Sequence, residues 1–348
     1  MSISIPDADW VPPQWEDEHR SPILIHFESM AEISSRSDIF PFVTHAPKFR
    51  TCMRYHRERF EGLAFFSAYC DIDGHADRGG VAAMIDNVLG VFTMTYHDSM
   101  CYTRNLECVY YDFVPLETNV QVTCFVLGKE NNRVSVRCQV IDAQNKVLVS
   151  STGVFSLVPI LMIDGKPMMK VWKQPPNVPI GNRPKNWIID FRNPFALLAD
   201  DLAADWISKG MRRIPVLNGL NSFDFGFAQK MTSDIFSDAV AVAGIIYFSK
   251  YTCGPPGRVN GGAIIAAFEH LFMHAVCHFQ MELLPKIQVR FIKGVPYNCL
   301  CSISVERMED SLLSASLRIQ QSPGTSWNEA DTVVAVTGTM LLNSSSKL

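Results

Sequence analysis

Two long apolar stretches, residues 81–96 and 263–279, run on without the Gly-Pro punctuation that interrupts much of the chain. Their length and their content of Ala, Met and Leu favour helix over strand. Apolar residues lie around most of the circumference of each stretch, which is typical of a helix packed on nearly all sides. We therefore predict two buried helices.

Alternation of apolar and polar residues at period two follows each predicted helix and predicts β-strands. The alternating segments are residues 120–124, 134–140, 300–305 and 312–319. Residues 142–145 predict a hairpin turn, and residues 320–328 are its longer counterpart. One buried helix followed by an antiparallel meander predicts an α+β unit in which a sheet wraps its helix.

The same features recur in the same order along the chain, which indicates an internal repeat. Residues 62–69 (GLAFFSAY) reappear as residues 244–251 (GIIYFSKY). The pairs Gly79-Gly80, Val114-Pro115 and Thr152-Gly153 reappear as Gly261-Gly262, Val295-Pro296 and Thr337-Gly338. The spacing between matched positions drifts by only a few residues, so we predict two tandem copies of one unit.

Between and around the copies, the composition changes. We expect an N-terminal arm at 1–25, a first unit at 26–158, a proline-rich linker at 159–200, a second unit at 201–343 and a tail at 344–348. The 348 residues suffice for two units, each with its own core. Hydrophobic residues make up 47% of the chain and charged residues 19%, which is typical of extensive buried surface.

Charge and hydropathy exclude several classes of protein. The net charge is -4 and no long basic run occurs, so a nucleic-acid partner is disfavoured. No apolar stretch reaches the roughly 20 residues that span a bilayer, and the first 18 residues lack the order of a signal peptide. The ten cysteines form no CxxC pair, and most lie in apolar alternating segments, which favours reduced, buried thiols.

Histidines at 270, 274 and 278 share one face of the second predicted helix. Such spacing can bind zinc, but no further set of ligand residues accompanies it. We interpret it as a packed or interface stripe and expect no metal and no cofactor.

The last three residues, Ser346-Lys347-Leu348, form the tripeptide that the peroxisomal import receptor reads. They follow a loose Asn-Ser-Ser tail, the exposed context that such an address requires. We therefore expect the peroxisomal matrix as the location and the import receptor as a partner; a chance match is the alternative.

The helix starts resemble the hotdog thioesterase superfamily, in particular its phenylacetyl-CoA-thioesterase-like branch. That branch carries His-Gly-Gly and then an acid on the central helix, nine residues after the His. Residues 260–269 (NGGAIIAAFE) and 77–86 (DRGGVAAMID) are similar to this motif, although Asn260 and Asp77 replace the His. Residues 105–157 are similar to the strand pattern of the family.

The resemblance implies a double hotdog: two long central helices, each wrapped by an antiparallel β-sheet, with the sheets joined side by side. It also implies hydrolysis of a fatty or related acyl-CoA to free acid and CoA. In this family, each active site combines the glycine-bearing helix end of one hotdog with the acid of the other. Site one would then join Asn260, Gly261 and Gly262 to Asp86. Site two would join Asp77, Gly80 and either Arg78 or Gly79 to Glu269.

These residue types suit thioester hydrolysis. The free N–H groups of a helix N-terminus can bind an oxyanion, and glycine lets a substrate approach the backbone. A carboxylate in an apolar helix has a raised pKa, suited to a general base. The alternative for Asp86 and Glu269 is a buried acid satisfied by a hydrogen bond or by an Arg of the other copy. We expect site one to be the working site.

Two further sets of polar residues stay open. The loop at 71–75 lies where the family often places another polar active-site residue, but its carboxylates equally suit an exposed turn. Arg104, Lys129, Arg133 and Lys293 are candidates for the CoA phosphates, with solvated surface as the alternative. Assembly into a homo-oligomer also stays open.

Two other functions fit the same fold. An (R)-specific enoyl-CoA hydratase carries an Asp-x-Asn-Pro-x-His loop, and Asp71 to His75 lacks its Asn-Pro and its spacing. A non-catalytic acyl-CoA-binding or scaffold protein is suggested by the absence of both motif histidines.

Overall fold

The computed structural model describes residues 49–56, 59–66, 71–72, 75–97, 99–158, 161–163, 166–168, 211–214, 227–230, 240–248, 258–279, 283–296, 299–309, 312–320 and 332–342. The predicted N-terminal arm, the C-terminal tail with Ser346-Lys347-Leu348 and the turn after residue 320 lie outside these residues.

Two long helices, α3 (Arg78–His97) and α5 (Gly261–Phe279), occupy the predicted positions. Each begins two or three residues earlier than its apolar stretch, because the glycine pairs belong to the first helical turn. Both are buried on nearly every side, as their apolar circumference predicts. Residues of α3 that are at most 3% exposed include Val81, Met84, Ile85, Val88, Leu89 and Phe92. Those of α5 include Ala263, Ile264, Ile265, Phe268, Leu271 and Phe272.

The strands of the first part of the chain are β1 (Phe49–His56), β2 (Arg59–Phe66), β3 (Asp71–Ile72), β4 (His75–Ala76), β5 (Met100–Tyr110), β6 (Asn119–Glu130), β7 (Arg133–Ile141), β8 (Val147–Val158), β9 (Leu161–Ile163) and β10 (Lys166–Met168). Those of the second part are β11 (Met211–Ile214), β12 (Phe227–Lys230), β13 (Val240–Phe248), β14 (Leu283–Phe291), β15 (Cys299–Glu309), β16 (Leu312–Gln320) and β17 (Thr332–Leu342). The four predicted strand segments lie within β6, β7, β15 and β16.

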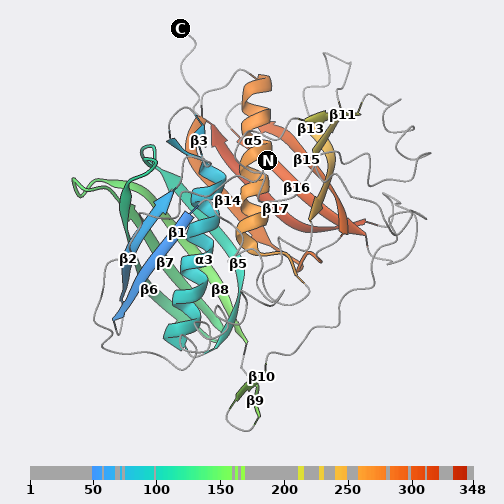
Figure 1. Ribbon diagram of the computed structural model, residues 1–348. Coiled ribbons are helices and arrows are strands. Elements are labelled where there is room, and N and C mark those ends of the chain that lie inside the picture. The colour runs from blue at the N-terminus through green and yellow to red at the C-terminus, as the bar shows by residue number, and fades with distance from the viewer. Residues whose placement is uncertain are drawn as a thin grey trace, which may run out of the picture.

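A 13-stranded antiparallel sheet carries both helices, in the order β1-β2-β6-β7-β8-β5-β14-β17-β16-β15-β13-β12-β11. From the centre outward, one half has the order β5, β8, β7, β6 and β2, and the other has the order β14, β17, β16, β15 and β13. In both halves the first of these strands directly follows the helix, and the last one precedes it in the sequence. The two halves therefore have the same connectivity. Figure 1 shows α3 against the blue and green strands and α5 against the orange and red ones.

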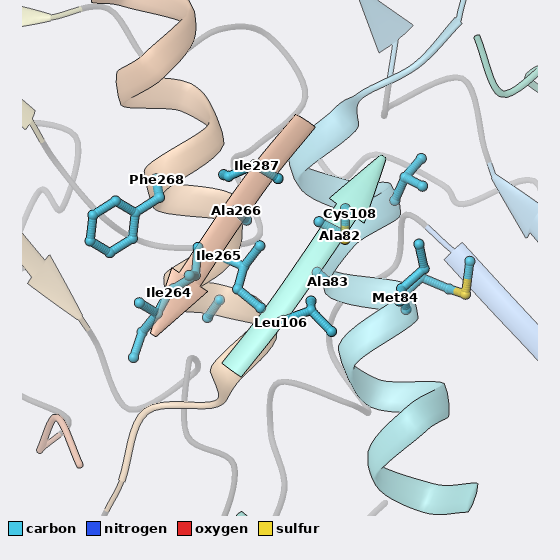
Figure 2. Close-up of a cluster of buried hydrophobic side chains, with 14 of the residues drawn as sticks. Ala82, Ala83, Met84, Leu106, Cys108, Ile264, Ile265, Ala266, Phe268 and Ile287 are labelled. Carbon is cyan, nitrogen blue, oxygen red and sulfur yellow. The ribbon is translucent and has the colours of Figure 1, made fainter. Parts of the chain in front are cut away.

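The sheet is continuous across its middle because β5 pairs with β14. Leu106 stands opposite Val289 there and Cys108 opposite Ile287, on either side of the central pair Glu107–Gln288. All four side chains are at most 1% exposed. Figure 2 shows Leu106, Cys108 and Ile287 of these strands beside Ala83 of α3 and Ile265 of α5.

The two helices contact each other closely through their glycines. A Cβ built on Gly262 would lie 2.9 Å from both Cα and O of Ala83, and one built on Gly79 would lie 3.2 Å from both Cα and O of Ala266. Carbon atoms prefer separations of about 3.5–4.0 Å, so a side chain at Gly262 would push α5 away from α3. Glycine is required at these positions by close approach.

The turn predicted between two strands of the first half is present. The turn at residues 142–145 joins β7 to β8, with the N–H of Asn145 donating to the carbonyl of Asp142 at 3.1 Å. Asn145 adopts a positive φ of 64°, a conformation that Asn tolerates. The predicted linker at 159–200 contains the short hairpin β9–β10, and its remaining residues lie outside the described part.

The seam yields a prediction about stability. Leu106→Ala removes apolar volume from the β5–β14 pairing and should lower the free energy of unfolding by about 2–5 kcal/mol. Denaturant unfolding measures the change. Gln288→Ala is the matched control, since Gln288 is an exposed residue of the same strand pair and should change stability by less than about 0.5 kcal/mol. Equal effects of the two substitutions would contradict the importance of the seam.

Candidate active site

Each helix begins with a polar cap that satisfies one N–H of its first turn. Asp77 Oδ2 accepts a hydrogen bond from the N–H of Gly80 at 2.8 Å, and Asn260 Oδ1 accepts one from the N–H of Gly262 at 2.8 Å. Asp and Asn are favoured caps because a side-chain oxygen can replace the missing intrahelical acceptor. The positions of the absent motif histidines are therefore helix caps.

Packing between the helices settles which residues of the two starts correspond. Gly79 rests on the backbone of Ala266, and Gly262 rests on the backbone of Ala83. Gly79 therefore corresponds to Gly262, and Arg78 corresponds to Gly261. The choice between Arg78 and Gly79, which the sequence left open, therefore falls on Arg78, and the two glycine pairs are offset by one residue. The sequences are similar enough for either alignment, and only the contact between the helices distinguishes them.

Site one brings together three segments. A Cβ built on Gly261 would lie 2.7 Å from Asp86 Oδ2 and 3.1 Å from Thr103 Oγ1, so the start of α5 directly abuts the carboxyl of α3. Thr103, at the start of β5, donates its hydroxyl proton to Asp86 Oδ1 at 2.9 Å. The structure thus places Asp86 beside Gly261, 175 positions further along the sequence.

The environment of Asp86 favours its protonated form. Burial raises the pKa of this carboxyl from 3.8 to about 6, while the hydroxyl of Thr103 and the N–H of Gly262 lower it in part. The residue is 4% exposed, and no cation is among the causes of its pKa shift. A carboxyl with a pKa near 6 is ionised at neutral pH and basic enough to accept a proton from water.

The N–H groups at the start of α5 divide into two roles. The N–H of Gly262 is engaged by Asn260 Oδ1, so it belongs to the cap. Within the described residues, the N–H of Gly261 makes no hydrogen bond, and it lies at the positive end of the helix dipole. The amide of Asn260 is held at both ends, because its Nδ2 donates to Asn87 Oδ1 at 3.2 Å.

Site two is built differently, although its position is equivalent. Arg78 Nε lies 3.7 Å from Glu269 Oε2, and the Glu269 side chain is 1% exposed. The Arg78 guanidinium lies over the ring of Tyr110, 4.1 Å from its centroid, and the Tyr110 hydroxyl donates to the carbonyl of Arg78 at 3.0 Å. One interpretation of Glu269 from the sequence was a buried acid paired with an Arg of the other copy. The contact with Arg78 agrees with this interpretation.

Three residues of these sites were missed by sequence reasoning: Thr103, Asn87 and Tyr110. Thr103 and Tyr110 lie within one alternating strand, where a polar or aromatic residue carries no distinctive signal. The sequence carries no signal for Thr103, because the register shift between Thr103 and Asn105 that turns it toward Asp86 appears only in the structure.

The loop at 71–75 does not join site one through any described contact. The ring of His75 stacks on Phe113 at a centroid distance of 4.5 Å, and its backbone forms a bridge with Pro115. Of the candidates for the CoA phosphates, Arg104 is exposed and its Nε donates to Ser156 Oγ at 2.8 Å. Lys129, Arg133 and Lys293 are exposed as well.

Metal and membrane features were sought among the described residues. In this part of the chain, no group of three or more His, Cys, Asp or Glu is arranged to hold a metal ion. None of the described helices combines the length and apolar character of a membrane span. The side chains of His270, His274 and His278 lie outside the described part, so the interpretation of this stripe stays a prediction.

No protein-family model matches the sequence, and no curated protein matches it. Solved structures do match. A TesB protein from Mycobacterium avium subspecies paratuberculosis is similar over 88% of this chain and 98% of its own, with 12% identity and a TM-score of 0.50. A protein with a hotdog fold from Alicyclobacillus acidocaldarius has 12% identity over 84% of this chain and 94% of its own. A 12:0-ACP thioesterase from Umbellularia californica has 10% identity over 83% and 98%, and both have a TM-score of 0.47.

The likenesses at a TM-score of 0.47 are too distant to carry an argument. At 12% identity, the likeness to the TesB protein shows the fold alone. That fold is the hotdog fold.

The buried carboxyl yields a prediction about stability and pH. Folding raises the pKa of Asp86, so its stabilising contribution is complete below pH 3.8 and is lost as the pH rises through about 6. Asp86→Asn cannot ionise, so above pH 7 it should be more stable than the parent protein by about 2–3 kcal/mol, since one pKa unit is 1.36 kcal/mol. Thermal unfolding at pH 5 and pH 8 measures this difference.

Asp112→Asn is the control for this measurement. Hydrogen bonding to Lys146 lowers the pKa of the exposed Asp112, so its removal should give no stabilisation at pH 8. A stability difference between Asp86→Asn and the parent that does not grow with pH would contradict the raised pKa of Asp86.

Proposed function

We propose that the protein is an acyl-CoA thioesterase with a double hotdog arrangement, in which site one hydrolyses the thioester. The observation that carries the proposal is the contact between Asp86 and Gly261, which joins the acid of one half to the helix start of the other. The same connectivity on both sides of the β5–β14 seam supports a double hotdog.

The proposed reaction uses water as the nucleophile. Asp86 Oδ1 is held by Thr103, so Oδ2, the oxygen nearest to Gly261, takes a proton from water as the water oxygen bonds to the thioester carbon. The carbonyl oxygen becomes an oxyanion and accepts a hydrogen bond from the N–H of Gly261. The tetrahedral intermediate then breaks its C–S bond, and the CoA thiolate receives the proton from Asp86. The products are the free acid and CoA.

Burial of Asp86 supports catalysis over a purely structural role. A buried ionised carboxylate without a cation destabilises the fold, whereas Glu269 of the other half has Arg78 beside it. A perturbed pKa at a convergence of polar groups is typical of an active site. This difference favours a thioesterase over a non-catalytic acyl-CoA-binding protein.

The hydratase alternative needs a His beside the catalytic acid. The described contacts of His75 are with Phe113 and Pro115. The proposal therefore prefers hydrolysis to hydration. Release of free thiol marks a thioesterase, and loss of enoyl absorbance marks a hydratase.

The choice of CoA over a carrier protein rests on location. Ser346-Lys347-Leu348 is the import tripeptide of the peroxisomal matrix, and acyl-CoA is the thioester class that we expect there. An assay of thiol release from short, long and branched acyl-CoAs, beside acylated carrier protein, tests this choice. Hydrolysis of the carrier-bound thioester alone would contradict it.

Removal of the proposed base should abolish turnover. Asp86→Asn should lower kcat/KM by about 10²- to 10⁴-fold, the contribution of a positioned general base. In the parent protein, kcat/KM should rise tenfold per pH unit below about pH 6 and level off above it, because only ionised Asp86 accepts a proton. Thiol release between pH 5 and pH 8 measures both effects.

Thr103 offers a matched pair of variants for the same profile. Thr103→Val removes the hydroxyl that lowers the pKa of Asp86, so the midpoint of the pH profile should move upward, whereas Thr103→Ser should keep it. Undiminished turnover in Asp86→Asn would show that site one is not the working site.

The proposed location has its own test. A fusion with a fluorescent protein at the N-terminus should enter peroxisomes of a eukaryotic cell, and deletion of Leu348 should leave it in the cytosol. Unchanged import after the deletion would contradict the role of the tripeptide.

A further inference from the structure

The two helix starts of this chain are equivalent in position and unequal in chemistry. At site one, the absence of a side chain on Gly261 lets Asp86 and Thr103 approach the helix start, since a Cβ there would lie 2.7 Å from Asp86 Oδ2 and 3.1 Å from Thr103 Oγ1. At site two, the residue equivalent to Gly261 is Arg78, whose side chain is only 18% exposed and extends to Glu269. The acid therefore faces a glycine backbone at site one and a guanidinium group at site two.

The surroundings of Arg78 fix it in this place. Its guanidinium lies between the carboxylate of Glu269 and the ring of Tyr110. The hydroxyl of Tyr110 donates to the carbonyl of Arg78 and so holds the backbone, while the guanidinium contacts Glu269 as an ion pair at 3.7 Å and its Nε makes no hydrogen bond within the described residues. Burial lowers the pKa of Arg78, but the charge of Glu269 and the neighbouring Tyr110 raise it above its ordinary value overall. The guanidinium thus stays charged inside the protein.

The strands at the seam repeat the asymmetry. Thr103 faces α3 because the strand register shifts between Thr103 and Asn105, whereas β14 runs from Lys286 to Val289 in regular pairing with β5 and has no such shift there. Thr103 donates to Asp86, whereas Lys286 Nζ pairs with Glu107 Oε2 at 3.0 Å. Tyr110 lies four residues before Val114, and the residue four before the matching Val295 is Phe291, which has no hydroxyl. Site two thus keeps the buried acid and the helix cap of site one but not its glycine.

We infer that site two is a closed counterpart of the active site: it takes no thioester, and its Arg78–Glu269 pair locks the two halves of the chain together. This inference rests on the proposed function, because the ligand that site two excludes is the thioester substrate named there. Arg78 belongs to α3 and Glu269 to α5, so the pair joins the first half to the second. Breaking a buried pair by removing one partner leaves an uncompensated charge and is strongly destabilising.

Binding stoichiometry tests the exclusion. Isothermal titration with S-dodecyl-CoA, a thioether that cannot be hydrolysed, should give one molecule per chain for the full-length protein. The stoichiometry and kcat/KM should be the same within about threefold in Glu269→Gln, since Glu269 acts on Arg78 and not on substrate. Two molecules per chain would overturn the inference, as would a loss of turnover in Glu269→Gln as large as that in Asp86→Asn.

A double-mutant cycle tests the lock. Arg78→Met and Glu269→Gln should each lower the melting temperature by several degrees. The double variant should be clearly more stable than the sum of the two changes predicts, because it leaves no unpaired charge. Additive effects would overturn the structural role of the pair. Lys286→Met with Glu107→Gln is the control cycle, since this pair is about one-third exposed and should show little coupling.

The outcomes separate this inference from the proposed function. No binding of the thioether and no turnover of any acyl-CoA would count against the thioesterase. The double-mutant cycle alone would then test whether the Arg78–Glu269 pair stabilises the contact between the two halves. Turnover that depends on Asp86, together with two bound molecules per chain, would support the thioesterase and overturn the closed site.

Discussion

The structure depends on the close crossing of two buried helices at their N-termini. Gly262 lies against the backbone of Ala83 and Gly79 against that of Ala266, at separations that leave no room for a side chain. This contact brings the start of α5 to the middle of α3, one turn from Asp86. A side chain at Gly262 would push the helices apart, and the start of α5 would move away from Asp86. The active-site geometry is therefore a consequence of helix packing, with the seam between β5 and β14 holding the two halves in register.

A single chain that contains two copies of one unit can let them diverge. In a symmetric dimer of identical units, any change at one helix start would occur at the other as well. Here one start carries glycine before its acid and the other carries arginine. The first arrangement leaves a carboxyl with a raised pKa and a free N–H beside it, which suits chemistry. The second neutralises its carboxylate with a buried cation, which suits stability. Under the proposed function, one helix start supplies the reacting acid and the other a buried ion pair.

The polar groups at the working site are arranged with little redundancy. Thr103 holds one oxygen of Asp86, the Asn260 cap engages the N–H of Gly262, and Asn87 holds the amide of Asn260. The other oxygen of Asp86 and the N–H of Gly261 are left for substrate in the proposed reaction. In the proposed reaction, Thr103 fixes the orientation of the Asp86 carboxyl before water reacts, and the second oxygen of that carboxyl accepts the proton.

The sequence alone determined the two buried helices and two strands of each meander. These follow from local patterns, namely apolar stretches of helical length and period-two alternation, whereas the pairing of Asp86 with the helix start at Gly261 was implied only by the resemblance to hotdog thioesterases. The tertiary structure decided that Arg78, and not Gly79, is equivalent to Gly261, because adjacent glycines look alike until one of them touches another helix. It also decided the roles of Thr103 and Tyr110, since both reach the sites across strand-to-helix contacts that leave no trace in local sequence. Long-range contacts set which acid stays unpaired, and no local pattern records them.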